Sequence, residues 1–162
     1  MRLFDTVGRS GFTYAWQMLR NHDDALDAVQ SSMAAVWDTR ERLEPGRDPR
    51  AWFFRVLRNK CIDLLRSRRG RTPAPLQSEP ADRGSNDPAD AASRREQVDR
   101  LRAELDRLPD EMREIILLRD YHDLPYAEMA EVLAIPQGTV MSRLHRARSA
   151  LRERMSASDG RS

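Results

Sequence analysis

The sequence predicts an all-α protein made of two small helical domains joined by a flexible, proline-rich linker. Ala, Leu, Arg and Glu dominate its 162 residues, glycine is scarce at 7 residues and β-branched side chains are sparse, a composition that favours helix. Apolar residues recur at helical spacing in two blocks, residues 1–70 and residues 96–155. Residues 71–95 between them hold four of the nine prolines and one large apolar side chain, Leu76, so we expect a flexible linker there.

Three helices are expected in the first block, near residues 10–20, 23–43 and 48–68. The second carries apolar side chains three and four positions apart, namely Leu26, Val29, Met33, Val36 and Trp37. The third opens at Asp48, a capping residue, followed by Pro49, whose missing N–H suits the first helical position. The apolar stripe of this third helix comprises Trp52, Phe53, Val56, Leu57, Ile62, Leu64 and Leu65.

The second block is expected to end in a helix-turn-helix. Its first apolar stripe, closed by Pro109, consists of Val98, Leu101, Leu105 and Leu108. Asp110 can cap the next helix, and Pro125 opens another before a short break at residues 135–138. The last helix then turns four apolar side chains inward: Val140, Leu144, Ala147 and Leu151. Two apolar-periodic helices around a short break predict a helix-turn-helix, and residues 156–162 are expected to fray.

The outer face of the last helix is basic. Residues 139–155 hold five Arg against one Glu, a net charge of +4. In a helix-turn-helix, the N-terminal residues of the second helix enter the major groove of DNA, where Arg forks onto guanine edges and Ser or Thr reaches bases or phosphates. The pattern therefore predicts a face that binds duplex DNA, with the candidate residues Thr139, Met141, Ser142, Arg143, His145 and Arg146.

Two further surfaces are predicted in the first block. Residues 46–71 carry eight Arg and one Lys against two Asp, a net charge of +7, with Trp52 and Phe53 near the helix start. Basic side chains interleaved with aromatic ones suit single-stranded or melted DNA, although core packing is the simpler explanation of the two aromatic rings. Residues 20–44 hold six acidic and three basic side chains, which predicts a protein partner, while helix capping accounts for part of this charge.

The inventory of residues argues against an enzyme. His22, His122 and His145 lie far apart with no Cys or carboxylate at metal-ligand spacing, and no glycine-rich phosphate loop occurs. We therefore expect no catalytic residue, no cofactor and no metal, and we interpret residues 120–123 as a polar turn. The single Cys61 is expected to be a buried thiol in a reducing compartment. Since no signal peptide and no apolar run of about 18 residues is visible, we expect a cytoplasmic location without membrane insertion.

Three segments resemble, in order, the extracytoplasmic-function (ECF) group of bacterial RNA polymerase sigma factors. The family's segment for binding core polymerase is similar to DDALDAVQSSMAAVW (residues 23–37). Its helix for promoter melting and −10 recognition is similar to PRAWFFRVLRNKCIDLLRSRR (residues 49–69). Its −35-reading domain is similar to the helix-turn-helix block with the specific motif GTVMSRLHRAR (residues 138–148). The resemblance covers nearly the whole chain and implies sigma region 2 at residues 1–70 and region 4 at residues 96–155.

The resemblance implies a role for each surface. Residues on or behind the surface that docks onto the polymerase's largest subunit would be Asp27, Val29, Gln30 and Trp37. Asn59 would face a flipped-out base of the −10 element, and the strand would be held by Arg55, Arg58 and Lys60. The −35 element would be faced by Met141, Ser142, Arg143, His145 and Arg146. Because one factor spans both elements, its linker is expected to stay extended.

The resemblance thus predicts an ECF sigma factor whose partners are core RNA polymerase, promoter DNA and an anti-sigma factor, a partner common in the family. Two other functions stay open. One is a helix-turn-helix regulator of duplex operators, against which the basic and aromatic first block argues. The other is a sigma-like decoy that sequesters an anti-sigma factor or polymerase. Leu26 and Ser31 keep the decoy open, because they stand where the family usually has acidic residues. Met141 stands where the family commonly has a basic residue, so the promoter sequence is expected to differ.

Overall fold

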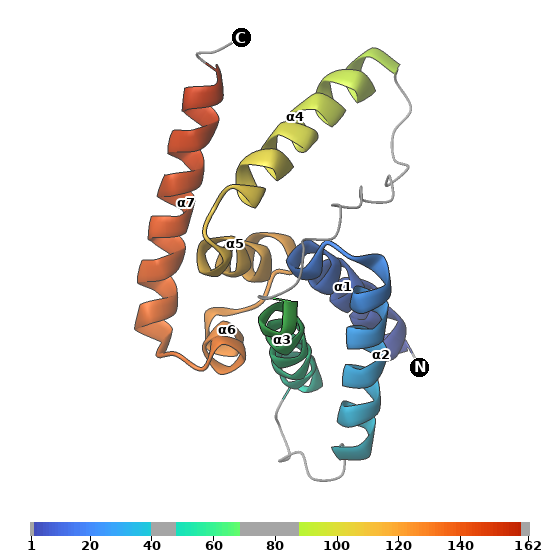
Figure 1. Ribbon diagram of the computed structural model, residues 1–162. Coiled ribbons are helices and arrows are strands. Elements are labelled where there is room, and N and C mark those ends of the chain that lie inside the picture. Colours follow the sequence, from blue (N-terminus) through green and yellow to red (C-terminus); the bar gives the residue numbers. More distant parts are fainter. Residues whose placement is uncertain (1, 40–47, 69–87, 160–162) are drawn as a thin grey trace.

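The computed structural model describes residues 2–39, 48–68 and 88–159, and within these ranges the chain is helical, with short turns and no strand. The helices are α1 (Arg2–Leu19), α2 (His22–Thr39), α3 (Pro49–Arg68), α4 (Pro88–Asp106), α5 (Asp110–Ile116), the π-helical η2 (Leu117–Tyr121), α6 (Tyr126–Leu133) and α7 (Gln137–Asp159). Figure 1 shows α1, α2 and α3 gathered on one side of the molecule, α5, α6 and α7 on the other, and α4 diverging from α7. The all-α prediction is confirmed.

The first three helices pack against one another in pairs, around a core that starts earlier in the chain than predicted. α1 begins at Arg2 instead of near residue 10, and Val7 is already buried in the core. The sequence did not indicate this earlier start, because Gly8 and Gly11 interrupt the apolar periodicity: glycine has a low helix propensity and no side chain to mark a face.

Side-chain caps explain where α2 and α3 begin. The Asn21 side chain accepts the backbone N–H of Asp24 at 2.9 Å, which satisfies one of the free donors at the start of α2. Asp48 accepts the backbone N–H of Arg50 at 2.8 Å, and α3 begins with proline, as predicted.

α6 and α7 form the predicted helix-turn-helix. α6 is followed by the capping residue Ala134, whose left-handed conformation (φ 55°, ψ 44°) turns the chain. The carbonyl of Pro136 then accepts the N–H groups of Thr139 and Val140 at 3.0 and 3.1 Å, which starts α7. Gly138 consequently belongs to the first turn of α7 and not to the break.

Several predicted boundaries are wrong. α4 begins at Pro88, so residues 88–95 are helical and not linker, because proline suits the first helical position and a run rich in Ala, Arg and Glu follows. α7 continues to Asp159, so most of the tail expected to fray is helical. Asp110 makes no capping hydrogen bond and instead accepts one from Arg113 at 2.9 Å.

The apolar stripe of α4 is only half buried. Leu108 is 4% exposed, but Val98 and Leu101 are 43% and 38% exposed, since only the C-terminal part of α4 meets the rest of the molecule. The carboxylate of Glu104, 5% exposed, ties this part to α7 through Arg154 at 3.9 Å. The predicted end of the second helix at residues 40–43, and most of the predicted linker, lie outside the described residues.

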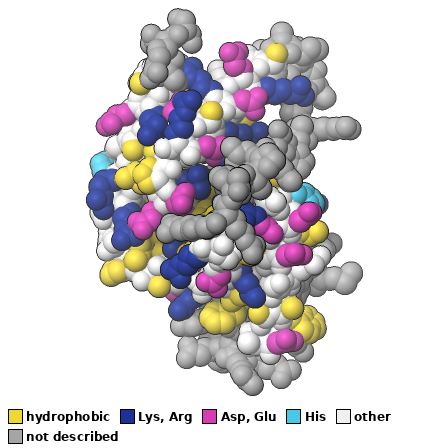
Figure 2. Space-filling model, viewed as in Figure 1, with side chains coloured by type: hydrophobic (Ala, Val, Ile, Leu, Met, Phe, Trp, Pro, Cys, Tyr) yellow, Lys and Arg dark blue, Asp and Glu magenta, His cyan; other side chains and the backbone are white. Residues whose placement is uncertain are grey.

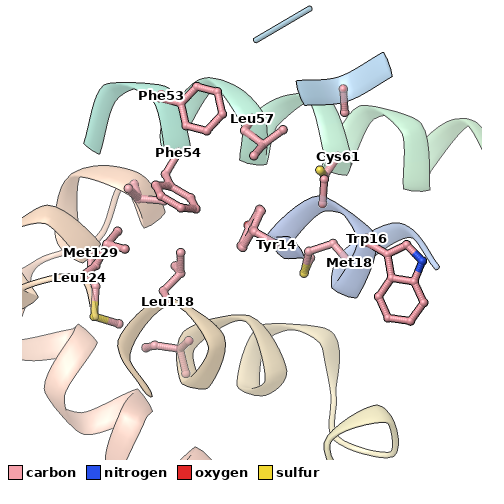
Figure 3. Packing of buried hydrophobic residues seen from close by; sticks show 14 of the residues in the cluster. Tyr14, Trp16, Met18, Phe53, Phe54, Leu57, Cys61, Leu118, Leu124 and Met129 are labelled. Atoms are coloured by element: carbon pink, nitrogen blue, oxygen red, sulfur yellow. The ribbon is translucent and has the colours of Figure 1, made fainter. Parts of the chain in front are cut away.

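The two helical blocks lie in direct contact, whereas the expected extended linker would hold them apart. α3 packs along α6, and buried side chains from both blocks form one continuous hydrophobic cluster. Figure 3 shows Tyr14 of α1 and Phe54 of α3 facing Leu118, Leu124 and Met129 of the second block. All five of these side chains are fully buried. The contact between the blocks is therefore a packed core and not a loose surface encounter.

Candidate nucleic-acid and polymerase interfaces

The predicted duplex-DNA residues of α7, here called the recognition face, are Thr139, Met141, Ser142, Arg143, His145 and Arg146. Because Val140, Leu144 and Ala147 are at most 2% exposed, the helix period turns the recognition face outward. Four of its side chains are exposed and the other two, Thr139 and Arg143, are partly exposed. The structure therefore brings all six together at the N-terminal half of α7, where a helix-turn-helix presents its reading residues.

A surface groove of about 250 Å³ lies beside the recognition face, between α5 and α7. Its lining includes the side chains of Glu111, Met112, Ile115, Arg143 and Arg146. Glu111 lies 3.7 Å from the Arg143 guanidinium, so this carboxylate partly balances one of the two cations. Two guanidinium groups at the edge of one groove can together take an anionic oxygen pair such as a phosphate.

The recognition helix is held against η2 by an ion pair, and η2 is in turn held to α6 by a cation–π contact. Arg148 of α7 forks onto Asp120, with Nε donating to Oδ2 at 3.0 Å. This hydrogen bond, partly offset by burial, raises the pKa of Arg148. Arg119 lies 5.1 Å from the ring centre of Tyr126 and donates to the Leu124 carbonyl at 3.0 Å. Residues 120–123, predicted to be only a polar turn, thus also help to fix the orientation of α7.

The four predicted −10 residues of α3, here called the melting face, are Arg55, Arg58, Asn59 and Lys60. Arg55, Asn59 and Lys60 are exposed to solvent. Arg58 differs from these three: its side chain is 21% exposed and turns toward α5. There it donates from Nε to Glu114 Oε1 at 2.7 Å and from an NH2 group to Oε2 at 3.3 Å. In this conformation the Arg58 guanidinium is bound to a carboxylate of the second block.

The aromatic residues of α3 pack as the simpler explanation predicted. Phe53 is 2% exposed and meets the edge of Phe54, with ring centroids 5.7 Å apart. Trp52 is partly buried, and its ring N–H is enclosed without an acceptor among the described residues. The buried thiol of Cys61 is confirmed, and burial raises its pKa to about 12.

The predicted partner residues of α2, here called the docking face, are Asp27, Val29, Gln30 and Trp37. Asp27, Gln30 and Trp37 are exposed, Trp37 at 51%, and Leu26 next to them is 40% exposed. Val29 is 5% exposed and lies behind this surface in the core. Figure 2 shows acidic and hydrophobic side chains along the edge where α2 runs, and basic ones interspersed with acidic ones on the side of α7. An acidic surface with exposed apolar side chains fits a protein partner better than DNA.

A polar cluster that the sequence did not predict lies between the two blocks. Glu114 of α5, 4% exposed, accepts hydrogen bonds from Arg58 and from the Tyr14 hydroxyl, the latter at 2.6 Å. Burial, together with the charge of Glu114, raises the pKa of Tyr14 well above its ordinary value. Burial alone would lower the pKa of Arg58, but the Glu114 carboxylate outweighs it and the pKa is raised. Arg58 and Glu114 are thus an ion pair when the two blocks are packed together, which is here called the closed arrangement.

His122 completes the contact between the blocks. It is 4% exposed, and its ring centroid lies 5.8 Å from that of Tyr14 and 5.3 Å from that of Phe54. Its backbone carbonyl accepts a hydrogen bond from Arg50. Burial, with a smaller contribution from the charge of Arg50, lowers the pKa of His122 to about 4, so the ring is neutral at physiological pH.

No periodicity marks Glu114 or His122 as buried residues. A glutamate in a helix that also carries Asp110 and Glu111, and a histidine in a polar loop, are ordinary surface patterns, so sequence reasoning missed both. The one available signal was the high count of arginines in the first block, because a buried arginine needs a carboxylate somewhere in the fold.

Within the described ranges, no helix is long and apolar enough to cross a membrane. Nor do three or more His, Cys, Asp or Glu side chains of those ranges gather where they could hold a metal ion.

Comparison with known proteins finds relatives for both blocks. A family model described as sigma-70 region 2 matches residues 3–71, and one described as sigma-70, region 4, matches residues 99–151. The chain is 34% identical over 146 residues to ECF RNA polymerase sigma factor SigE of Mycolicibacterium smegmatis, covering 88% of this chain and 56% of that protein. It is 34% identical over 137 residues to ECF RNA polymerase sigma factor RpoE of Cereibacter sphaeroides, covering 82% of this chain and 72% of the relative.

Among solved structures, the sigma factor RpoE in complex with the anti-sigma factor NepR from Bartonella quintana superposes with a TM-score of 0.76 at 26% identity. The match covers 96% of this chain and 95% of the other, so it includes both helical blocks. The chain spans little more than half the length of the Mycolicibacterium relative, at 56%.

Proposed function

The chain belongs to the ECF group of RNA polymerase sigma factors, and on that premise we propose that it binds core RNA polymerase, recognises −10 and −35 promoter elements and directs transcription initiation. The observation that carries the proposal is the presence of two distinct basic surfaces, the recognition face and the melting face, together with an acidic docking face on α2. A duplex-only regulator needs only the first of these surfaces. A factor that must read duplex DNA, hold a melted strand and bind polymerase needs all three.

Each surface has a chemically defined task in the proposed function. Arg143 and Arg146 are suited to the −35 element, because a guanidinium pairs with guanine edges or phosphates in the major groove. Arg55, Asn59 and Lys60 are exposed on α3 and are suited to a melted −10 strand. Asp27, Gln30 and Trp37 are suited to a basic and apolar patch on polymerase. The protein supplies no catalytic group to RNA synthesis, which is the chemistry of the polymerase, and acts with it in the cytoplasm.

We also propose an anti-sigma factor as a partner. The support is the similarity to a sigma factor whose structure was solved with one bound. The similarity extends over both blocks, at 96% of this chain, and so includes the surfaces from which such a partner could bind.

The test is run-off transcription with purified bacterial core polymerase, the full chain and a library of genomic promoter fragments, with the transcript ends sequenced. We expect discrete start sites that share two upstream elements. Polymerase binding without any start sites would point to the decoy function instead. Absence of polymerase binding would refute the proposal and favour the operator regulator.

In the same assay, Arg146→Ala is expected to weaken use of the cognate promoter by about 1–3 kcal/mol, because it removes one base or phosphate contact. Arg152→Ala is the matched control, since it removes an exposed arginine from another side of the same helix. Equal losses in both variants would show that only the overall charge of α7 matters, and would remove Arg146 from the reading residues.

A further inference from the structure

Glu114 of the second block holds a residue of the melting face of the first block. Its two carboxylate oxygens lie 2.7 and 3.3 Å from the guanidinium nitrogens of Arg58. The carboxylate is 4% exposed, so this pair is sheltered from solvent. A carboxylate offers a guanidinium the same pair of anionic oxygens as a DNA phosphate, so Glu114 and a DNA strand compete for one cation.

The surroundings make this contact dependent on the closed arrangement. Tyr14 belongs to α1, Arg58 to α3 and Glu114 to α5, so the three can meet only when the two blocks are together. A second hydrogen bond across the same boundary joins Arg50 of α3 to the backbone carbonyl of His122. A third contact, the ion pair between Arg20 and Asp106, joins the end of α1 to the end of α4.

Water can replace the polar contacts of the closed arrangement, which lie beside the hydrophobic cluster that the two blocks share. Charged and hydroxyl groups make up this part of the boundary, and each regains hydrogen bonds from water when the blocks separate. A buried ion pair contributes little net stability, because its attraction is offset by the cost of removing both charges from water. Removing one charge has a much larger effect, because the remaining charge is left buried and unpaired.

We propose that Glu114 is an autoinhibitory latch that, with Tyr14, holds Arg58 and keeps the −10-binding helix packed against the −35-binding domain until DNA and polymerase replace it. The inhibitory part rests on the proposed function, because it requires that Arg58 bind the melted strand. The latch itself does not, because it concerns only the equilibrium between closed and open arrangements of the isolated protein.

The latch is tested on the full chain without DNA or polymerase. Arg9→Cys on α1 and Glu153→Cys on α7 provide two exposed positions for fluorescent dyes. Cys61 does not interfere, because it is fully buried. Energy transfer between the dyes and the radius of gyration from X-ray scattering then report the separation of the blocks.

Glu114→Gln is expected to open the molecule, seen as a change in energy transfer and a larger radius of gyration with the helical circular dichroism retained. Tyr14→Phe, which removes only the hydroxyl group, is expected to act in the same direction but less strongly, and it guards against a folding defect in the first variant. Glu131→Gln is the matched control, since it removes an exposed carboxylate from the same block. Glu114→Gln and Tyr14→Phe proteins that stay folded and as closed as the control would overturn the latch.

Binding of single-stranded DNA is a second measurement, which tests the inhibitory role of Glu114 separately from its role in keeping the blocks together. Binding of a fluorescein-labelled single-stranded 20-mer DNA is expected to tighten about tenfold in Glu114→Gln if the open form is roughly a tenth of the wild-type population. Opening without any gain in DNA binding would overturn the inhibitory role and remove Arg58 from the melting face, while leaving the run-off test of the sigma function unaffected.

Discussion

At the scale of single residues, the boundary between the two blocks depends on groups whose protonation is fixed by burial. His122 is neutral because it is 4% exposed and because Arg50 lies nearby. The groups that face it are the Tyr14 ring from α1, the Phe54 ring and the Arg50 guanidinium from α3, and the neighbouring Tyr121 ring. None of these supplies an anion that would stabilise a protonated imidazole.

His122 makes stability depend on pH with a defined sign. Its pKa is lowered from 6.5 to about 4 in the folded protein, so the unfolded chain binds the proton more readily. The neutral ring makes its full contribution to the free energy of unfolding above pH 6.5. That contribution is lost as the pH falls toward 4, and the total loss is roughly 2–4 kcal/mol. Urea unfolding of wild type and His122→Phe at pH 7.5 and pH 5 should show a smaller acid loss in the variant.

Comparing the pH dependence of unfolding between wild type and His122→Phe separates the contribution of His122 from that of other titrating groups. Burial and the charge of Asp48 raise the pKa of Glu128, which favours the folded state as the pH falls, the opposite direction. That contribution is common to both proteins and cancels in the difference. Identical pH dependence in the two proteins would mean that the ring of His122 does not stay neutral in the folded state.

At the scale of helices, two glycines in α1 set how closely its neighbours approach. A Cβ atom at Gly11 would lie 2.6 Å from the ring of Phe53, which is 2% exposed and has no room to move. A Cβ atom at Gly8 would lie 2.5 Å from the terminal methyl group of Met33, the end of a flexible side chain. The same substitution should therefore have opposite effects at the two positions.

Gly11→Ala is expected to lower the free energy of unfolding by about 1–3 kcal/mol, because the overpacked ring must push α1 and α3 apart. Gly8→Ala serves as the matched control and should be neutral or stabilising by up to about 1 kcal/mol, since alanine has the higher helix propensity. Thermal and urea unfolding of both variants measure the difference. Equal effects would show that α1 and α3 can separate without cost.

At the scale of the whole molecule, the closed arrangement and the proposed function require different separations of the blocks. Elements named −10 and −35 lie about 25 base pairs apart, which is about 85 Å of duplex at ~3.4 Å per base pair. Blocks that share one hydrophobic cluster cannot reach both elements at once. A factor in this arrangement must therefore open before it engages a promoter.

Core polymerase should drive this opening. In the dye-labelled protein, added core polymerase is expected to lower energy transfer, and promoter duplex alone is expected to change it little, because the recognition face then acts without the melting face. Trp37→Ala, which removes an exposed side chain of the docking face, should require more polymerase for the same change. Full opening by promoter duplex without polymerase would favour a duplex-binding regulator.

The sequence by itself determined the helical class of the protein and most of its exposed surfaces, although not every helix boundary. Helical periodicity and capping residues are local properties, so they identified the inward residues of α7, the capped start of α3 and the buried Cys61. Periodicity also identified the recognition face, because fixing Val140 and Leu144 in the core fixes the direction of the residues between them.

Only the tertiary structure decided which surfaces meet. Arg58 and Glu114 are 56 residues apart in sequence, and Tyr14 and Glu114 are 100 apart. No periodic pattern links such positions, because their contact depends on how two separately helical blocks pack together. For the same reason the sequence suggested an extended molecule, whereas the structure has α3 packed against the second block. The physical cause is that side-chain direction is set within a helix, while burial of a charge depends on its distant partner.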